Sequence, residues 1–154
     1  MTSKERVLQR ERDRGRMAAQ AAQEASPTMT GTELNAADDR IPRFAEAVKH
    51  KNMLNRKAGQ EDGFVCGSSA GRVVRMIQNY DSDIYTAEPE DLPAQWRMVW
   101  STDPEKALPF IALSTSPYAI GDCCTENDVV YRSIMDNNVW SPSSYPTGWE
   151  EVSE

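Results

Sequence analysis

Residues suited to catalysis are few in this 154-residue chain, and they do not stand in a catalytic pattern. The one histidine, His50, lies between Lys49 and Lys51 in a stretch typical of a solvated helix face. Neither a Gly-x-Ser-x-Gly turn, a phosphate-binding glycine loop nor a His-Glu-x-x-His pair occurs. Acidic residues are plentiful, but nothing marks a particular pair of carboxylates for glycosidase chemistry. We therefore predict a protein that is not an enzyme and that uses no cofactor.

The potential metal ligands are also poorly arranged. The three cysteines are Cys66 and the adjacent pair Cys123 and Cys124, without the Cys-x-x-Cys spacing typical of zinc sites. Asp81-Ser82-Asp83 lacks the glycine and the distal glutamate of a calcium loop, so it fits a turn. We predict no metal site, and we expect the cysteines to be small buried residues of a protein assembled in a reducing cytosol.

The tryptophans suggest another chemistry, binding through an exposed aromatic ring. Trp140 lies between Asn137-Asn138 and Ser141-Pro142-Ser143-Ser144, among polar residues that offer little apolar cover. An indole on a rigid loop can stack on the apolar face of a sugar ring, while neighbouring Asn and Asp side chains bond to the hydroxyls. A contact between subunits would use the same residue equally well, so both interpretations stay open.

The C-terminal half contains an internal repeat, with one copy at 71–99 and the other at 127–152. In each copy a Val-Val pair begins a strand, an aliphatic–aromatic pair follows (Ile84-Tyr85 and Val139-Trp140), and a Pro-containing loop leads to Pro-x-x-Trp-x-x-Val. Trp96 and Trp149 align at an offset of 53 residues. Because modules this small need an aromatic anchor, we predict that Trp96, Trp149 and Val152 lie in the core.

The second copy resembles the type-3 chitin-binding domains of chitinases and cellulases, also called carbohydrate-binding module family 5/12. The resemblance covers residues 117–152 and rests on Tyr118-Ala119-Ile120-Gly121, Val130-Tyr131, Val139-Trp140-Ser141-Pro142 and Tyr145-Pro146-Thr147-Gly148-Trp149-Glu150-Glu151-Val152. It implies a compact three-stranded β module in which Trp140 is the surface aromatic residue and Trp149 the buried one. The candidate glycan contacts are Trp140, Tyr131, Asn138 and Tyr145, with Tyr85 at the matching place in the first, degenerate copy. The chain departs from that family at Cys124, where an aliphatic residue is usual, and at Asn127-Asp128, where Asn-Gly is usual.

The phrase Asn-Asn-Val-Trp-Ser-Pro, followed by Tyr-Pro-x-Gly-Trp-Glu, also resembles modules in structural proteins of tailed bacteriophages and prophages. Those modules sit on tail fibres, baseplates or head decorations. This second resemblance implies a virion protein, made in the host cytoplasm without a signal peptide, that displays its β module for attachment to a bacterial surface glycan. The alternative is a virion assembly protein whose β modules only pack against neighbouring subunits. Exposed Trp140 and Tyr131 side chains would favour sugar binding, whereas burial in an interface would favour assembly.

The elements that must position these residues follow from local composition. Residues 3–25 favour a helix interrupted at Gly15, so residues 1–30 form a helical or flexible arm that either orders against another subunit or frays. Within 31–60 a helix is predicted at 41–57, with Asp38 or Asp39 as its N-cap. From residue 61 onward, short β-prone runs separated by turn residues lie at 64–66, 72–77, 97–100, 110–113, 129–134 and 150–152.

The predicted fold class is therefore α+β, with N-terminal helices followed by two small repeated three-stranded β modules. The degenerate module spans 61–101 and the carbohydrate-binding-module-like one spans 102–154. Because the joining segment 101–116 contains Leu108, Phe110, Ile111 and Leu113, it is too apolar for a free linker, and we expect the modules to pack together.

Charge divides the chain between its halves. Residues 1–58 carry twelve Lys or Arg and eight Asp or Glu, a net charge of +4, whereas residues 59–154 carry five and sixteen, a net charge of −11. The acidic half would repel nucleic acids and anionic membranes, and no apolar run is long enough to span a bilayer. The partners expected are other virion subunits, bound through the N-terminal helices, and a bacterial surface glycan, with no nucleic acid and no membrane. Because modules of this size bury little apolar area, we also expect a homo-oligomer.

Overall fold

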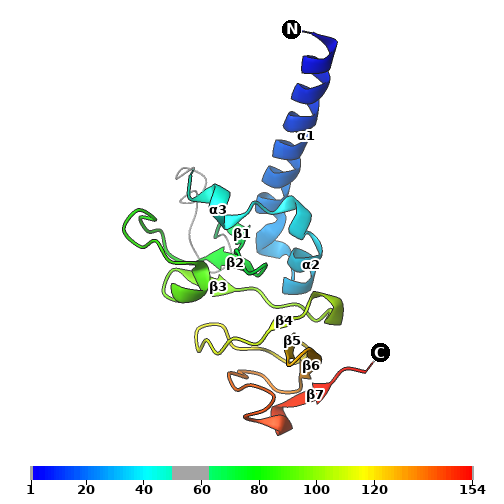
Figure 1. The fold of residues 1–154 in the computed structure, drawn as a ribbon, viewed down its shortest axis with the longest axis vertical. Helices are drawn as coiled ribbons and strands as arrows, with labels where there is room; N and C mark the ends of the chain where they lie inside the picture. The colour runs from blue at the N-terminus through cyan, green and yellow to red at the C-terminus, as the bar shows by residue number, and fades with distance from the viewer. Residues whose placement is uncertain (1, 50–62, 154) are drawn as a thin grey trace.

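The protein consists of a long N-terminal helix, a short helical segment and two small β-sheets, as seen in a computed structural model that describes residues 2–49 and 63–153. Figure 1 shows α1 (Ser3–Ala25) projecting away from the two sheets, which follow one another down the long axis of the molecule. The first sheet has the order β1-β2-β3, and the second has the order β4-β5-β6-β7. The predicted α+β class is thus confirmed.

Helix α1 occupies the predicted range, 3–25, and it continues through Gly15 without a break. Its residues are mostly strong helix formers, and its first turn is closed by a capping box. The Glu5 backbone N–H donates to Thr2 Oγ1 at 3.1 Å, and the Thr2 N–H donates to Glu5 Oε2 at 2.6 Å. No residue of α1 is buried. The helix is therefore an arm that only its C-terminal end attaches to the rest of the protein.

Two contacts fix the base of the arm on the first sheet. The Gln23 side chain donates from Nε2 to the Val65 carbonyl at 2.6 Å and accepts from the Val65 N–H at 2.9 Å. The Ser26 carbonyl accepts from Arg75 Nη2 at 2.9 Å. The Gln23 amide thus pairs with the outer edge of β1 (Val65–Gly67) much as a residue of another strand would.

The helix predicted at 41–57 is wrong in its described part. Residues 31–49 instead form α2 (Gly31–Ala36), the 3₁₀ turn η2 (Asp38–Arg40) and the single-turn helix α3 (Phe44–Ala47), while 50–57 lies outside the described residues. The Pro42 carbonyl accepts from the Gly67 N–H at 2.9 Å, so this stretch runs alongside β1 in place of a helical turn. Ile41, Phe44 and Ala47 are buried against the first sheet, and these tertiary contacts override local helix propensity.

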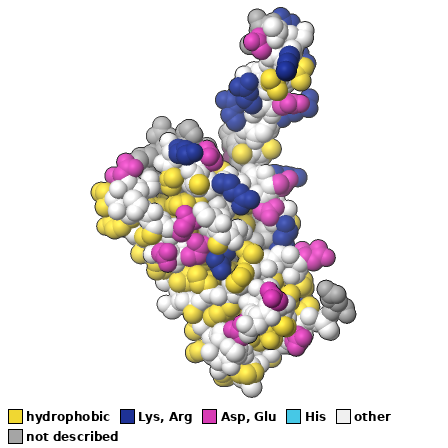
Figure 2. Space-filling model, in the orientation of Figure 1, with side chains coloured by type: hydrophobic (Ala, Val, Ile, Leu, Met, Phe, Trp, Pro, Cys, Tyr) yellow, Lys and Arg dark blue, Asp and Glu magenta, His cyan; other side chains and the backbone are white. Residues whose placement is uncertain are grey.

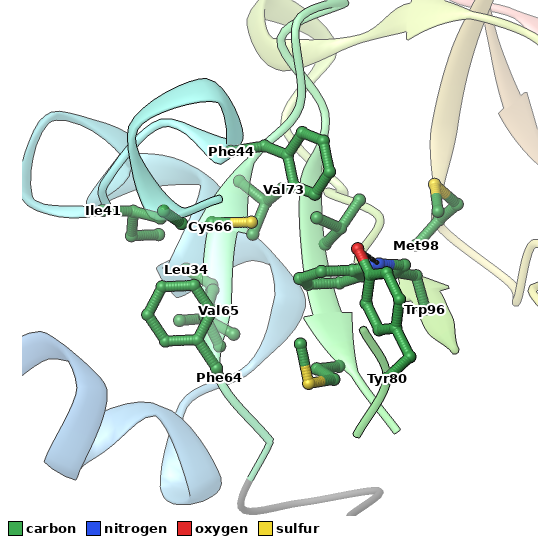
Figure 3. Close-up of a cluster of buried hydrophobic side chains, with 13 residues drawn as sticks. Leu34, Ile41, Phe44, Phe64, Val65, Cys66, Val73, Tyr80, Trp96 and Met98 are labelled. Atoms are coloured by element: carbon green, nitrogen blue, oxygen red, sulfur yellow. Dashed lines mark hydrogen bonds between the residues drawn. The ribbon is translucent and has the colours of Figure 1, made fainter. Parts of the chain in front are cut away.

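The first sheet carries the larger core. Its strands are antiparallel: β1 pairs with β2 (Val73–Met76), and β2 pairs with β3 (Trp96–Met98). Figure 3 shows the fully buried Trp96 with the rings of Phe44 and Tyr80 on either side; their centroids lie 5.8 and 6.2 Å from that of Trp96, both edge-on. Trp96 Nε1 donates to the Tyr80 hydroxyl at 3.1 Å, which satisfies the buried indole.

The second sheet has four strands, not the predicted three. Strands β5 (Cys123–Glu126), β6 (Val129–Ser133) and β7 (Trp149–Glu151) are antiparallel, and β4 (Leu108–Pro109) adds a two-residue parallel strand beside β5. The strand predicted at 110–113 does not form. Phe110 instead packs its ring against Tyr118 and Trp149, with ring centroids 5.4 and 6.0 Å away. Strand β5 was not predicted from the sequence.

The two sheets repeat the same pattern of backbone hydrogen bonds. The Ile77 N–H donates to Gln95 O at 2.7 Å in the first module, as the Ile134 N–H does to Gly148 O at 3.0 Å in the second. Likewise Val99 N–H bonds to Val73 O and Val152 N–H to Val130 O, both at 2.9 Å. This register matches Trp96 with Trp149 and places Cys66 and Cys124 at the same position of the first antiparallel strand. It also matches Val73 with Val130, whereas an alignment of the two Val-Val pairs would match Val73 with Val129. The structural register therefore differs by one residue from the sequence repeat at this point.

Trp100 joins the two modules. Its ring packs against both core clusters and stacks on Tyr118 at a centroid distance of 4.1 Å, with 12° between the ring planes. Its Nε1 donates to the Ser116 carbonyl at 3.0 Å, and the Ser116 hydroxyl accepts from the Met98 N–H at 2.9 Å. Helix α2 also reaches this joint, because Asn35 Nδ2 donates to the Val99 carbonyl at 3.0 Å. The joint is therefore built from both modules and from the N-terminal segment.

Candidate functional site

Two aromatic side chains are exposed side by side at the end of the second module. Trp140 is 48% exposed and Tyr145 is 43% exposed, and their ring centroids lie 5.6 Å apart with the planes tilted by 48°. Both belong to the loop between β6 and β7, which also contains the 3₁₀ turn η5 (Pro146–Gly148). We call Trp140 and Tyr145 the aromatic pair.

The loop that carries the pair is tied to the core from both ends. The Trp140 carbonyl accepts from Trp149 Nε1 at 2.8 Å, so the buried indole holds the backbone of the exposed one. Just before it, Asn138 and Tyr118 exchange two backbone hydrogen bonds of 2.9 Å. Asn137 takes a left-handed conformation, with φ of 53°, that lets the chain turn toward this bridge. The position of Trp140 is thus set by hydrogen bonds to buried groups.

Gly148 makes room for the second ring. A Cβ atom at this position would lie 2.9 Å from Tyr145 Cδ1, 3.0 Å from Met135 Sδ and 3.1 Å from Asn138 Nδ2. The Tyr145 carbonyl accepts from the Gly148 N–H at 3.1 Å, which closes the turn. Sequence reasoning used Gly148 as part of a motif without giving it a role; the structure shows that the Tyr145 ring occupies the space that a side chain would fill.

Hydroxyl groups lie beside the aromatic pair. The Ser141 hydroxyl donates to Ser144 Oγ at 2.8 Å and accepts from the Ser144 N–H at 3.2 Å. The Ser143 N–H donates to Glu126 Oε1 at 3.0 Å, which ties the loop to the β5–β6 hairpin. The exposed side chains of Ser143, Ser144 and Glu126's neighbour Asn127 give this end of the module a polar rim. An exposed apolar platform beside polar groups can contact the apolar part of a ligand while the polar groups hydrogen-bond to it.

Two of the other candidate contacts do not share this surface. Asn138 is fully buried, and its Nδ2 donates to Ser133 Oγ at 3.1 Å and to the Gly148 carbonyl at 3.0 Å. The prediction that Asn138 contacts a glycan is therefore wrong, because its amide satisfies buried acceptors. Tyr131 is half-buried and packs on the second core cluster from β6. Exposure of Trp140 and Tyr131 was expected to favour sugar binding. Trp140 is exposed, whereas Tyr131 is partly covered by its own module.

The remaining predicted residues lie elsewhere. Tyr85 is 52% exposed, but it belongs to the loop after β2 in the first module and is not part of the aromatic pair. Trp96 is fully buried and Trp149 is 5% exposed, each in the cluster of its own module. Val152 is not in the core: it follows the end of edge strand β7, is half-buried and lines a surface hollow.

Nothing in the described part of the chain is arranged for metal or thiolate chemistry. Residues 2–49 and 63–153 contain no group of three or more His, Cys, Asp or Glu side chains that could hold a metal ion, and His50 lies outside them. Burial raises the pKa of all three thiols, to about 12 for Cys124. Such thiols stay protonated at neutral pH and make poor nucleophiles.

The carboxylates of Asp122 and Asp136 hydrogen-bond to the backbone of the loop before β5. Its Oδ2 accepts from the Ala119 N–H at 2.8 Å, while Asp136 Oδ1 accepts from the Ile120 N–H at 3.0 Å. Burial, with a smaller effect from the neighbouring Asp136 charge, raises the pKa of Asp122. The two carboxylates hold the loop that leads from Tyr118 into β5.

Among the described residues, no helix has both the length and the apolar character needed to cross a membrane. A comparison with known proteins found no family, no curated protein and no solved structure that matches this chain.

Proposed function

We propose that this protein is a non-enzymatic structural subunit of a tailed-phage virion whose second β module binds a glycan on the bacterial surface. The observation that carries the proposal is the aromatic pair, which is solvent-exposed and yet fixed by hydrogen bonds to the core. When the backbone that carries exposed aromatic rings is already ordered, little conformational entropy is lost on binding, and the binding free energy is more favourable.

The chemistry of the pair suits a sugar. The faces of Trp140 and Tyr145 can cover the axial C–H groups of pyranose rings, and the tilt of 48° between them allows contact with two faces of a twisted chain. The serine hydroxyls and the Tyr145 hydroxyl can exchange hydrogen bonds with the ligand. Both rings are exposed to solvent, whereas sites for small molecules usually enclose their ligand, which favours a polymer over a small free sugar.

The virion context is supported by the sequence resemblance and by the shape of the molecule. A chain that displays a β module on a particle needs a separate element to attach it, and α1 extends away from the aromatic pair, toward the other end of the long axis in Figure 1. The arm has no buried residue, so its length before the base at Gln23 is available to another virion subunit.

A purely structural role is the second candidate, and one observation favours it. Ile120 and Ile134 are 62% and 47% exposed on the second module, next to the backbone contact between Gly121 and Ser133. Exposed aliphatic residues of this kind suit a subunit interface, and they offer no ring for a sugar. In that case the β modules would only pack against neighbouring subunits.

The test is a binding titration with chito-oligosaccharides and with host cell-wall fragments. Trp96 and Trp149 are buried and Trp100 is half-buried, so a ligand that covers the aromatic pair should mainly change the emission of Trp140. Tyr145→Ala keeps that reporter and should weaken binding about tenfold. Trp140→Ala removes the reporter, so its binding is measured by calorimetry, where we expect no detectable heat.

Tyr85→Ala is the matched control, since Tyr85 is exposed to a similar degree in the other module. If only the second module binds, this variant should bind as the wild type does. The proposal of glycan binding would be abandoned if neither ligand changed the emission or released heat with folded wild-type protein. The assembly role would then stand, to be tested through its partners.

A further inference from the structure

One face of α1 combines cationic and apolar side chains. Arg6, Arg10 and Arg14 follow one another at intervals of four residues, and Val7 and Met17 lie three residues before Arg10 and three after Arg14. Residues at these intervals share one face of a helix. Val7 and Met17 are 51% and 71% exposed, and the three arginines are exposed as well. We call these five residues the basic stripe.

The described part of the chain does not neutralise the stripe. Among the described residues no ion pair involves Arg6, Arg10 or Arg14. Asp13, three residues after Arg10, is already hydrogen-bonded to Gln9 and Arg16. Figure 2 shows the basic side chains standing out along the projecting arm. The stripe therefore presents positive charge and apolar surface together to whatever lies beside the arm.

A hollow with the complementary character lies on the second module. It has a volume of about 550 Å³, and its lining includes the carboxylates of Asp103 and Glu105 and the half-buried side chains of Val130 and Val152. The nearest lysine, Lys106, is engaged by Asp38 at 3.2 Å. A hollow lined by two acidic residues and two valines fits an arginine whose aliphatic stem also makes apolar contacts.

We infer that the basic stripe of one copy docks in the acidic hollow of a second copy. The arm cannot reach the hollow of its own chain, because α1 leaves the sheets at its base and points away from them (Figure 1). The charges of the two halves, +4 for residues 1–58 and −11 for residues 59–154, favour arm-to-module contact and disfavour contact between two modules. Val7 and Met17 distinguish this partner from a polyanion such as nucleic acid, which would offer them no apolar surface.

This contact joins different surfaces of the two copies. Such a contact is either exchanged reciprocally in a two-fold dimer, with each arm in the hollow of the other copy, or repeated head to tail in a ring or an open chain. The inference shares with the proposed function the premise that the arm is an assembly element, and it is independent of sugar binding.

The experiment measures self-association of the full chain by sedimentation velocity and light scattering, over a range of protein concentrations at low and high salt. Arg10→Glu with Arg14→Glu reverses the stripe, and Lys4→Glu with Arg12→Glu is a matched double reversal on other faces of α1. We expect the stripe variant to raise the dissociation constant at least about tenfold. The control variant should associate as the wild type does, and high salt should weaken the association of both.

A charge exchange tests the acceptor. Glu105→Arg with Ser153→Arg makes the hollow basic, and this variant alone should be monomeric. Mixed in equal amounts with the stripe variant, it should associate again, because its unchanged basic stripe can dock in the unchanged acidic hollow of the stripe variant. Circular dichroism of each variant establishes that it is folded.

The inference is overturned if the wild type is monomeric at every concentration, if the stripe and control variants weaken association equally, or if the mixture stays monomeric. It is also overturned if the arm binds polyphosphate or DNA while the chain does not self-associate. Trp140→Ala should leave self-association unchanged and the stripe variant should leave sugar binding unchanged, so failure of one proposal is separate from failure of the other.

Discussion

Replacement of glycine by alanine should lower stability at Gly31 and raise it at Gly15. Gly31 begins α2 against the joint between the modules, where an added Cβ would lie 2.1 Å from the Trp100 carbonyl oxygen and 3.3 Å from Val99 Cγ1. Gly15 lies inside α1, where an added Cβ would meet nothing within 4 Å. Alanine at 31 must therefore displace backbone, whereas alanine at 15 only improves helix propensity.

The magnitudes follow from these surroundings. Moving α2 away from the Trp100 carbonyl also stretches the Asn35 bond to the Val99 carbonyl and the bond from the Thr102 N–H to Thr32 Oγ1. With overpacking and two weakened hydrogen bonds, we expect Gly31→Ala to lower the free energy of unfolding by about 3 kcal/mol. In a domain of this size that corresponds to a Tm lower by about 6 to 12 °C. Gly15→Ala should stabilise the arm by about 1 kcal/mol.

Two measurements separate the effects. Thermal unfolding followed by circular dichroism reports the Tm of each variant, and amide hydrogen exchange reports opening of the arm. We expect exchange in residues 5–20 to slow about fivefold in Gly15→Ala with little change in Tm, because the arm buries no residue in the core. A Gly31→Ala variant with the wild-type Tm would show that α2 does not lie against the Trp100 carbonyl, and the reasoning about the joint would fail.

Three further outcomes are expected. Asp128→Gly should stabilise the protein by about 1 kcal/mol in urea unfolding, because the hairpin turn between β5 and β6 gives Asp128 a φ of 65° that glycine adopts without strain; a loss of stability would contradict this turn. Since burial raises the pKa of Asp122, the folded state holds that proton more tightly than the unfolded chain, so stability falls as pH rises from the ordinary value of 3.8 toward the folded pKa. Asp122→Asn should therefore reduce the fall of Tm with pH, measured from about pH 3.5 to pH 7. If the dependence of Tm on pH were unchanged, other groups would be its cause. The buried thiols of Cys66, Cys123 and Cys124 should resist a thiol reagent in the native protein and all react after unfolding in guanidinium; fast native labelling would show that the clusters open.

The elements that the sequence predicts well are those with strong local signals. Helix α1 occupies its predicted range because Arg, Glu, Gln and Ala dominate it, and Gly15 costs too little to break it. Strands β2 and β6 lie within one or two residues of their predicted bounds, since runs of β-branched residues end in turn residues there.

The elements that were missed depend on tertiary contacts. Ile41, Phe44 and Ala47 have helical spacing, yet Ile41 ends the turn η2 while Phe44 and Ala47 lie in the separate single-turn helix α3, and all three are buried in the first core cluster. Strand β5 (Cys123–Glu126) contains a single β-branched residue, Thr125, so its local signal is weak, and it is held by pairing with β6. An alignment of Cys124 with Cys66 would have indicated it, because both occupy the same register position in their modules.

The candidate surface was predicted in part. Trp140 and Tyr145 follow from aromatic residues in a polar loop, and the structure places them beside each other. Asn138 was misjudged because an asparagine after Asn137 in a polar loop gives no local sign of burial, and its environment is made by Ser133 at the end of β6 and Gly148 in η5. The role of Gly148 depends on a distance to the Tyr145 ring that no local pattern encodes.

The side-chain amide of Gln23, at the base of the arm, covers the exposed edge of the first sheet. Strand β1 is an edge strand, and the Val65 N–H and carbonyl that Gln23 covers are the groups with which a further strand would pair. A mechanical load on α1 is resisted at this point by two hydrogen bonds acting together. Once they break, the edge of β1 is open at Val65, while the Pro42 carbonyl still covers the Gly67 N–H. Tension on the arm and exposure of the Val65 backbone are therefore one event.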